Sequence, residues 1–132
     1  MSTIKKFEDL EIWQIAEKLS LKIFTESTIG EFYKDFRFKD QIRAASGSIM
    51  DNIAEGFERS SRLEFINFLG FAKGSCGEVK SQLHRAKDQQ YITEDFFTEL
   101  YESYDRLSAN IAGFIGYLNR TSIKGQKFKD RN

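Results

Sequence analysis

The amino-acid sequence predicts an all-α fold, an up-down-up-down antiparallel four-helix bundle, on three observations. In four segments, apolar residues recur at spacings of three and four, which is the period of one face of an α-helix. The 132 residues include no proline, whereas an average usage of ~5% would give about six or seven. Alternation with a period of two, which marks a half-buried strand, is absent over any useful length. Four unbroken helices with short connections favour a bundle.

The first helix is expected over residues 8–25, and it is apolar over more than half of its circumference. One stripe consists of Ile12, Ile15, Ala16, Leu19 and Ile23. A second stripe beside it consists of Leu10, Trp13 and Phe24. Residues 25–35, which include Gly30, are expected to form the connection to the next helix.

The second helix is expected over residues 38–57, with Gly56 marking its end. Its stripe consists of Phe38, Ile42, Ala45, Ile49, Ile53 and Phe57. Ser60 or Ser61 can cap a third helix, and Ser61 with Glu64 three residues later has the spacing of a capping box.

The third and fourth helices are expected over residues 62–87 and 94–119, the fourth capped by Thr93. The third has a stripe close to a heptad pattern, formed by Ile66, Leu69, Ala72, Cys76, Val79, Leu83 and Ala86. The fourth has the most regular stripe, formed by Phe97, Leu100, Tyr104, Leu107, Ile111, Phe114 and Leu118.

Length and charge indicate one helical domain, residues 1–120, and a basic tail, residues 121–132, that we expect to be disordered. The chain carries 20 Lys and Arg against 20 Asp and Glu. Residues 120–132 contain five basic groups and one acid, so this stretch contributes +4 and residues 1–119 contribute −4. The pI of 6.6 is below the value of about 9 that is usual for a basic nucleic-acid module.

We expect a cytoplasmic protein without membrane contact. One cysteine, Cys76, cannot form an intramolecular disulfide, which suits a reducing compartment. No stretch approaches the ~18 apolar residues of a membrane span, and the N-terminus lacks the apolar core of a signal peptide.

The residue inventory predicts no catalytic residue, no metal site and no cofactor. A di-iron site in a bundle needs two Glu-x-x-His units, but His84 is the only histidine and is expected at the surface. Cys76 is expected to be a buried structural thiol. The small residues Gly70, Gly74, Ser75 and Gly77 lack the spacing of a phosphate-binding loop. Because a glycine inside a helix costs ~1 kcal/mol, we expect them to let another helix approach closely.

Polar residues inside the second and third apolar segments form a further candidate cluster. They are Arg43, Asn52, Glu55, Arg59, Ser75 and Glu78. They could form a solvated face with intrahelical pairs worth a few tenths of a kcal/mol each. Equally, they could form a network buried between helices or subunits, where each unmatched group would cost ~1–3 kcal/mol.

Three blocks of the sequence resemble a known family. Residues 7–14 (Phe-Glu-Asp-Leu-Glu-Ile-Trp-Gln) are similar to the opening motif of the four-helix-bundle proteins encoded in intervening sequences of bacterial 23S rRNA genes. The block Gln-Ile-Arg-Ala-Ala at 41–45, with Asn-Ile-Ala-Glu-Gly at 52–56 and Arg59, resembles the family's most distinctive region. Gly74-Ser75 followed by Glu78 resembles its third block. Ile42 departs from the usual paired arginines, and Cys76-Gly77 departs from a usually apolar position.

The resemblance spans residues 7–118 and implies a protomer of a ring-like homopentamer. It also implies kinship with the accessory protein of diversity-generating retroelements, which binds reverse transcriptase and nucleic acid. The resemblance implies no established biochemical role.

Self-association is also indicated by the aromatic content. Thirteen Phe, five Tyr and one Trp are many for so small a core, and the first and third predicted helices are apolar on two sides. The candidates for the subunit interface are Trp13, Phe24, Phe65, Phe68 and Phe71.

Three functions remain open at this point. The first is a non-catalytic homo-oligomer that binds RNA or a nucleic-acid–protein complex. Its candidate contacts are Arg43, Arg59, Arg62, Lys73, Lys80, Lys124, Lys127, Lys129 and Arg131. The second is a scaffold that binds another protein and never contacts nucleic acid. The third, an enzyme, would require a pocket around Asn52, Glu55, Arg59 and Glu78. A continuous positive groove on the assembled oligomer would favour RNA, and an acidic surface would favour protein partners.

Overall fold

The computed structural model describes residues 4–121, and every regular element in that range is helical. The elements are a 3-10 turn η1 (Phe7–Asp9) and the helices α1 (Glu11–Glu26), α2 (Gly30–Lys34), α3 (Phe36–Glu58), α4 (Arg62–Asp88) and α5 (Glu94–Arg120). The predicted all-α class is confirmed. Apart from Thr121, the predicted basic tail lies outside the described residues.

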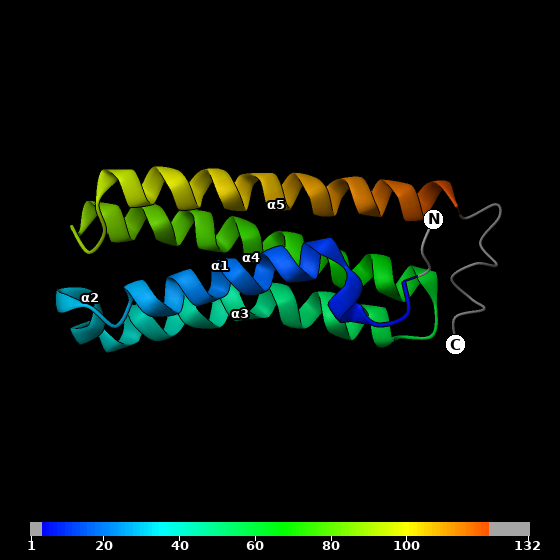
Figure 1. Cartoon of the computed structure of the whole chain (residues 1–132), viewed down its shortest axis with the longest axis horizontal. Helices are drawn as coiled ribbons and strands as arrows, with labels where there is room; N and C mark the ends of the chain where they lie inside the picture. Colours follow the sequence, from blue (N-terminus) through cyan, green and yellow to red (C-terminus); the bar gives the residue numbers. More distant parts are fainter. Residues whose placement is uncertain (1–3, 122–132) are drawn as a thin grey trace.

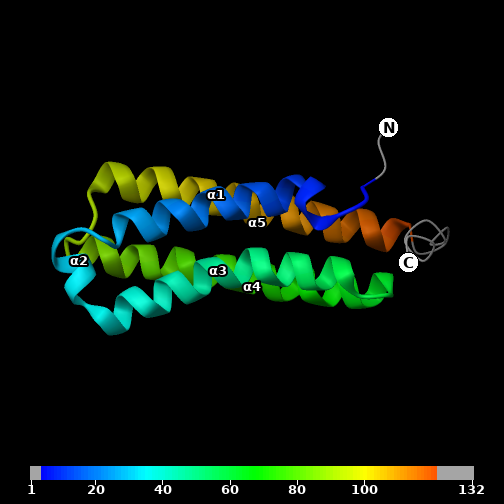
Figure 2. The same cartoon turned by 60° about the horizontal axis from the view of Figure 1, so that its bottom comes forward.

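The four long helices lie side by side along the long axis of the molecule (Figure 1). A turned view places α1 and α5 in one layer and α3 and α4 in the other (Figure 2). Helix α3 packs against both α1 and α4, and α4 also packs against α5. The short α2 lies at the end where α1 passes to α3. Within residues 4–121, no helix is long and apolar enough to cross a membrane.

The predicted connection at residues 25–35 contains the extra helix α2. Its Phe32 is 2% exposed, with its ring centroid 5.7 Å from that of Phe38 and 5.4 Å from that of Tyr91. Asp35 then opens α3 two residues earlier than expected, because its Oδ1 accepts the backbone N–H of Phe38 at 3.2 Å. The Tyr91 hydroxyl donates to the other Asp35 oxygen at 2.7 Å, which lowers the pKa of Asp35.

Of the two serines predicted as possible N-caps of α4, the cap is Ser61, and the predicted N-cap Thr93 of α5 is confirmed. The Ser61 hydroxyl accepts the N–H of Glu64 at 3.0 Å, and the Thr93 hydroxyl accepts the N–H of Phe96 at 3.0 Å. These bonds satisfy backbone donors that the first turns of α4 and α5 would leave unpaired.

Gly56 has a role other than the predicted one. Helix α3 continues past it to Glu58, and Arg59 leaves the helix with an extended backbone (φ −72°, ψ 157°). A Cβ atom built on Gly56 would lie 2.6 Å from Cβ of Phe68 and 3.0 Å from Cδ1 of Phe65. The glycine is therefore needed where α3 and α4 approach most closely, and its prediction as the helix end is wrong.

The core contains most of the predicted stripe residues. On α5, the fully buried ones are Leu100, Tyr104, Leu107, Ile111 and Leu118. The Tyr104 hydroxyl is buried and has no hydrogen-bond partner among the described residues. Burial raises the pKa of Tyr104, because the charged phenolate would be desolvated.

Tyr104→Phe is expected to raise the free energy of unfolding by about 1 kcal/mol, because it removes a buried hydroxyl that gains no hydrogen bond. Urea denaturation followed by circular dichroism measures the change. Tyr91→Phe is the control, since it removes a hydroxyl that donates to Asp35 and should lower stability. A Tyr104→Phe protein less stable than the parent would contradict the expectation.

Candidate functional site

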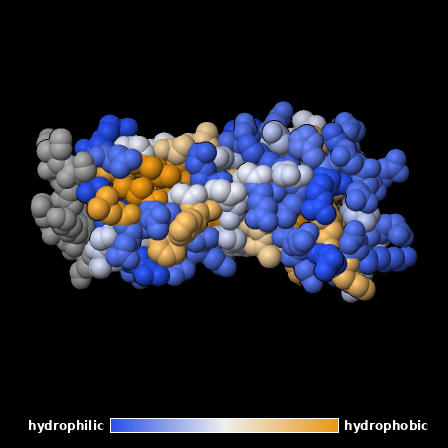
Figure 3. Space-filling model, turned by 180° about the vertical axis from the view of Figure 1, so that it is seen from behind, coloured by the Kyte–Doolittle hydropathy of each residue, from blue (hydrophilic) through white to orange (hydrophobic). Residues whose placement is uncertain are grey.

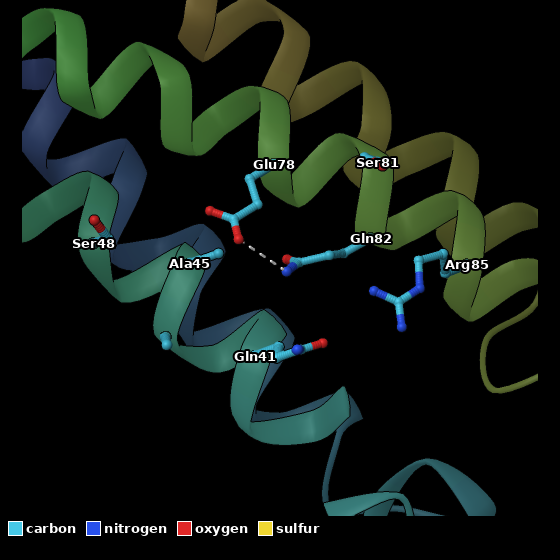
Figure 4. A pocket seen from close by; sticks show the side chains of 8 residues that line it. Gln41, Ala45, Ser48, Glu78, Ser81, Gln82 and Arg85 are labelled. Carbon is cyan, nitrogen blue, oxygen red and sulfur yellow. Dashed lines mark hydrogen bonds between the residues drawn. The ribbon is translucent and has the colours of Figure 1, made fainter. Parts of the chain in front are cut away.

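An open groove lies between α3 and α4, with a volume of about 490 Å³ (Figure 4). Its lining residues are Gln41, Ala44, Ala45 and Ser48 from α3, with Glu78, Ser81, Gln82 and Arg85 from α4. Half of these side chains are alanine or serine, so the space between the helices is left unfilled.

Gln82 brings an unsatisfied polar atom into the groove. Its side chain extends from α4 into the space between the helices (Figure 4), and the residue is only 5% exposed. Its Nε2 donates to Oε2 of Glu78 at a long 3.5 Å, and its buried Oε1 has no partner among the described residues. An unpaired buried acceptor costs ~1–3 kcal/mol, and this oxygen is enclosed at the base of the groove.

Glu78 and Arg85 give the groove opposite charges along its length. They lie seven residues apart on α4, a rise of roughly 10 Å. The Arg85 guanidinium carbon lies 4.6 Å from the centroid of the Phe38 ring. Neither Glu78 nor Arg85 forms an ion pair within residues 4–121. The protomer therefore leaves one negative and one positive group available for a ligand or partner.

A polar network beside the groove ties α3 to α4. Asn52 Nδ2 donates to the backbone oxygen of Ser48 at 2.8 Å and to its Oγ at 2.9 Å. Ser75 Oγ donates across the helix pair to Ser48 Oγ at 3.1 Å. The structure thus brings together Asn52 and Ser75 of the predicted cluster through Ser48, which lies between them.

Glu55 and Arg59 form a separate, solvated group near the end of α3. Arg59 donates to Glu55 Oε2 at 2.8 Å and to Glu64 Oε1 at 3.5 Å, and its guanidinium carbon lies 4.7 Å from the Phe68 ring centroid. The hydrogen bond to Glu55 raises the pKa of Arg59. Of the two interpretations of the cluster, the interhelical network fits Asn52 and Ser75, and the solvated face fits Glu55 and Arg59.

The predicted basic contacts do not gather on one face. Arg43 points towards α1, where its Nε donates to Ser27 Oγ at 2.7 Å and its guanidinium carbon lies 4.2 Å from the Phe24 ring centroid. Lys80 points towards α5 and donates to Asp105 Oδ1 at 2.8 Å, which raises the pKa of Lys80 and lowers that of Asp105.

The other predicted basic contacts fall into two groups. Arg62 is half-buried and Lys73 is exposed, both on α4. Lys124, Lys127, Lys129 and Arg131 lie outside the described residues.

One of the predicted interface residues lies in the protomer core. Phe65 is 0% exposed, with its ring centroid 5.9 Å from that of Phe57 on α3 and 5.6 Å from that of Phe114 on α5. Its prediction as an interface residue is wrong, because it faces both neighbouring helices. The remaining four reach the surface: Phe24 (50% exposed), Phe71 (52% exposed) and the half-buried Trp13 and Phe68.

The glycines of α4 face open space. A Cβ atom on Gly70, Gly74 or Gly77 would meet nothing within 4 Å. Within the described residues, no other helix approaches these glycines closely, so the expectation that they admit one is wrong there. At these three positions no side chain projects from the outer surface of α4 next to the groove.

Cys76 and His84 lie in different environments on α4. Cys76 is 0% exposed, and burial raises its pKa to about 12. His84 is exposed, with its ring centroid 4.8 Å from that of Phe97. Among the described residues, no group of three or more His, Cys, Asp or Glu is placed to hold a metal ion.

A family model described as 23S rRNA-intervening sequence protein matches residues 8–113. The chain belongs to this family. Its fold is similar to a crystal structure from Bacteroides thetaiotaomicron, a protein with unknown function from the S23 ribosomal protein family. The TM-score is 0.74 at 22% identity, covering 80% of this chain and 95% of the other. No curated protein matches the chain.

In this member of the family, the sequence prediction missed Gln41, Gln82 and Arg85 as groove residues. A signal for two of them is present, since Ser75, Glu78, Gln82 and Arg85 follow one another at helical spacings of three and four. Gln41 is recognised only once α3 is placed beside α4.

Proposed function

We propose that this chain is a non-catalytic assembly protein whose copies form a ring-like homopentamer. The observation that carries the proposal is the open α3–α4 groove, where within residues 4–121 a buried acceptor has no partner and two charged side chains form no ion pair. A groove of this composition between two helices suits association with another chain better than it suits catalysis, because it lacks an activated nucleophile or base.

The proposed protomer is an up-down-up-down four-helix bundle. In support, contacts between neighbouring helices join later residues of one helix to earlier residues of the other, as antiparallel helices require. The pairs are Ser20 with Ser46 and Ser27 with Arg43 for α1 and α3, and Lys80 with Asp105 and Lys87 with Glu94 for α4 and α5. Ser48 with Ser75 and Gly56 with Phe68 give the same order for α3 and α4.

Exposed apolar side chains support self-association. Among residues 4–121, seven large ones are between 46% and 66% exposed: Leu21, Phe24, Ile29, Tyr33, Phe36, Leu63 and Phe71. Figure 3 shows hydrophobic areas on the face seen from behind, the largest towards the end of the bundle where α5 ends. Apolar surface of this kind on a small protein usually marks an interaction site.

Multi-angle light scattering at micromolar concentration tests the assembly. The expected mass is five times that of the 15.4 kDa chain. A particle of 15.4 kDa would overturn the proposed function.

RNA contact is the second part of the proposal, and it is assigned to the basic segment. Residues 120–132 carry a charge of +4, whereas residues 1–119 carry −4 and two of their cations, Arg59 and Lys80, already bind carboxylates. In a ring whose axis is parallel to the helices, the basic segments of all copies begin at the same end of the ring, where α5 ends. Several weak phosphate contacts on one rim would add through avidity.

Deleting residues 121–132 is expected to weaken RNA retention and flatten its salt dependence, because the segment's basic groups no longer displace counterions from phosphates. Filter binding of a single-stranded RNA over a salt series measures both, and an unchanged oligomer mass is the control. Binding unaffected by the deletion contradicts the role of the segment. A full-length chain that retains no RNA would instead favour the alternative, a protein scaffold without nucleic-acid contact.

A further inference from the structure

A second hollow, of about 430 Å³, lies between α1 and α5, the two helices that form one layer of the bundle (Figure 2). Three cations line it, Lys18 and Lys22 from α1 and Arg106 from α5, and none of its described lining residues is acidic. Residues 1–119 carry a net charge of −4, so this hollow is a local concentration of positive charge on an acidic body. A concave site with one sign of charge attracts the opposite one, so its ligand is an anion.

Two of the three cations are available to a ligand. Within residues 4–121, Lys18 and Arg106 form no ion pair, whereas Lys22 binds Oε2 of Glu99 at 2.7 Å. Arg106 Nη2 donates to Ser103 Oγ at 3.4 Å, and that hydroxyl donates to the backbone oxygen of Glu99 at 2.9 Å. Ser103 therefore holds one edge of the guanidinium beside the hollow and leaves its other N–H groups for an anion.

Apolar surface lies beneath and beside these cations. The floor of the hollow is aliphatic and consists of Ile15, Leu19 and Leu107. A neighbouring hollow of about 580 Å³ shares Lys18 and Lys22 with it and adds Leu21, which is 64% exposed, and Phe96. Hollows of several hundred Å³ with an apolar lining and a few polar groups are typical of small-molecule sites. An organic group attached to the anion would thus find apolar contacts towards Leu21.

Acidic residues at both ends of this α1–α5 seam limit the length of the ligand. Glu26 and Glu99 line the hollow next to Lys22, and Glu11 lines the hollow on the other side, next to Asn110. A nucleic-acid strand laid along the seam would bring phosphates against carboxylates at each end, and like charges in contact are unfavourable. A compact anion between the two ends avoids this repulsion.

We infer that the α1–α5 hollow binds the phosphate of a small phosphomonoester, with its organic group directed towards Leu21 and Phe96. A phosphomonoester carries about −1.5 to −2 charges at pH 7, which Lys18 and Arg106 together balance. The planar guanidinium fork of Arg106 fits two phosphate oxygens, and the exposed amide of Asn110 supplies a further donor. The site lies within one copy of the chain, so it does not depend on the proposed assembly.

Isothermal titration calorimetry of the full chain with phenyl phosphate tests the site. Lys18→Gln combined with Arg106→Gln is expected to weaken binding about tenfold or more, because two charged hydrogen-bond donors are lost. Arg37→Gln combined with Lys73→Gln is the matched control, since it removes the same charge from exposed positions outside the hollow. That variant should change the affinity by less than about twofold, because distant surface charges are screened.

Two further ligands and one further variant test the chemistry and the orientation. Benzoate has the same ring and a single charge, so it should bind about tenfold more weakly than phenyl phosphate. Leu21→Ala should weaken phenyl phosphate about threefold and leave inorganic phosphate unchanged, because only the organic group contacts that side chain. Leu21 is largely exposed, so the variant keeps its fold.

The inference is overturned if phenyl phosphate does not bind, if both double variants lose the same affinity, or if benzoate binds equally well. Displacement of phenyl phosphate by a single-stranded RNA oligonucleotide would also overturn it, because the hollow would then contact RNA. Light scattering on the same samples separates the inference from the proposed function. A monomeric chain that binds phenyl phosphate would overturn the assembly and support this site, and a pentamer that does not bind it would do the reverse.

Discussion

Phe65→Ala is expected to lower the free energy of unfolding by about 3–5 kcal/mol, the usual cost of truncating a fully buried phenylalanine. The side chain is 0% exposed and packs edge-on against Phe57 and Phe114, so it joins the start of α4 to both α3 and α5. Its loss leaves a cavity where three helices meet. Since small domains are stable by only about 5–15 kcal/mol, the variant should be close to unfolding. Urea denaturation followed by circular dichroism measures the effect.

Phe71→Ala is the matched control on the same helix. Phe71 is 52% exposed, so its truncation should change the stability of the protomer by less than about 0.5 kcal/mol. Both variants must be compared at one protein concentration, because association adds to the apparent stability. Equal effects of the two substitutions would mean that Phe65 does not lie in the core.

Gly56→Ala is expected to destabilise the protein by about 2–3 kcal/mol, although alanine is the better helix former. The added Cβ would lie 2.6 Å from Cβ of Phe68, and neither atom can move without its backbone. Helices α3 and α4 would have to separate, and the contacts beside Gly56 would loosen. Thermal and urea denaturation measure the loss.

Gly47→Ala isolates the packing effect from helix propensity. Gly47 lies in the same helix, and a Cβ there would meet nothing within 4 Å. This substitution should stabilise the protein by about 0.5–1 kcal/mol. If Gly56→Ala also stabilised the protein, the close approach of α3 and α4 at that point would be refuted.

The long helices could be predicted because a repeating apolar stripe is a property of the sequence itself. Helix α2 could not, since five residues are too few to show a period. The predicted apolar stripe of α4 begins at Ile66, which is half-buried, whereas the buried residues of this helix begin at Phe65. Helix α4 packs against both α3 and α5, so its buried arc is wider than a single stripe predicts.

The site was less predictable, because it depends on the alignment of one helix with another. The spacing within α3 correctly put Glu55 and Arg59 side by side. The pairing of Asn52 with Ser75 through Ser48 depends on the register between α3 and α4. Arg43 was expected in the same cluster, but it lies nine residues before Asn52 and therefore on the opposite side of α3, where its partner Ser27 comes from the turn after α1. Gly56 illustrates a further ambiguity, since a glycine near a helix end can serve as a stop or as a close contact.

The short link between α3 and α4 also bears on the order of folding. Only residues 59–61 separate the two helices, and Gly56 meets Phe65 and Phe68 just nine and twelve positions further along the chain. Closing so short a loop costs little chain entropy, and contacts between near neighbours in sequence generally form fast. We therefore expect the α3–α4 hairpin to be structured in the transition state, with α1 and α5 adding to it later. Gly56→Ala should accordingly slow folding more than it speeds unfolding in stopped-flow kinetics.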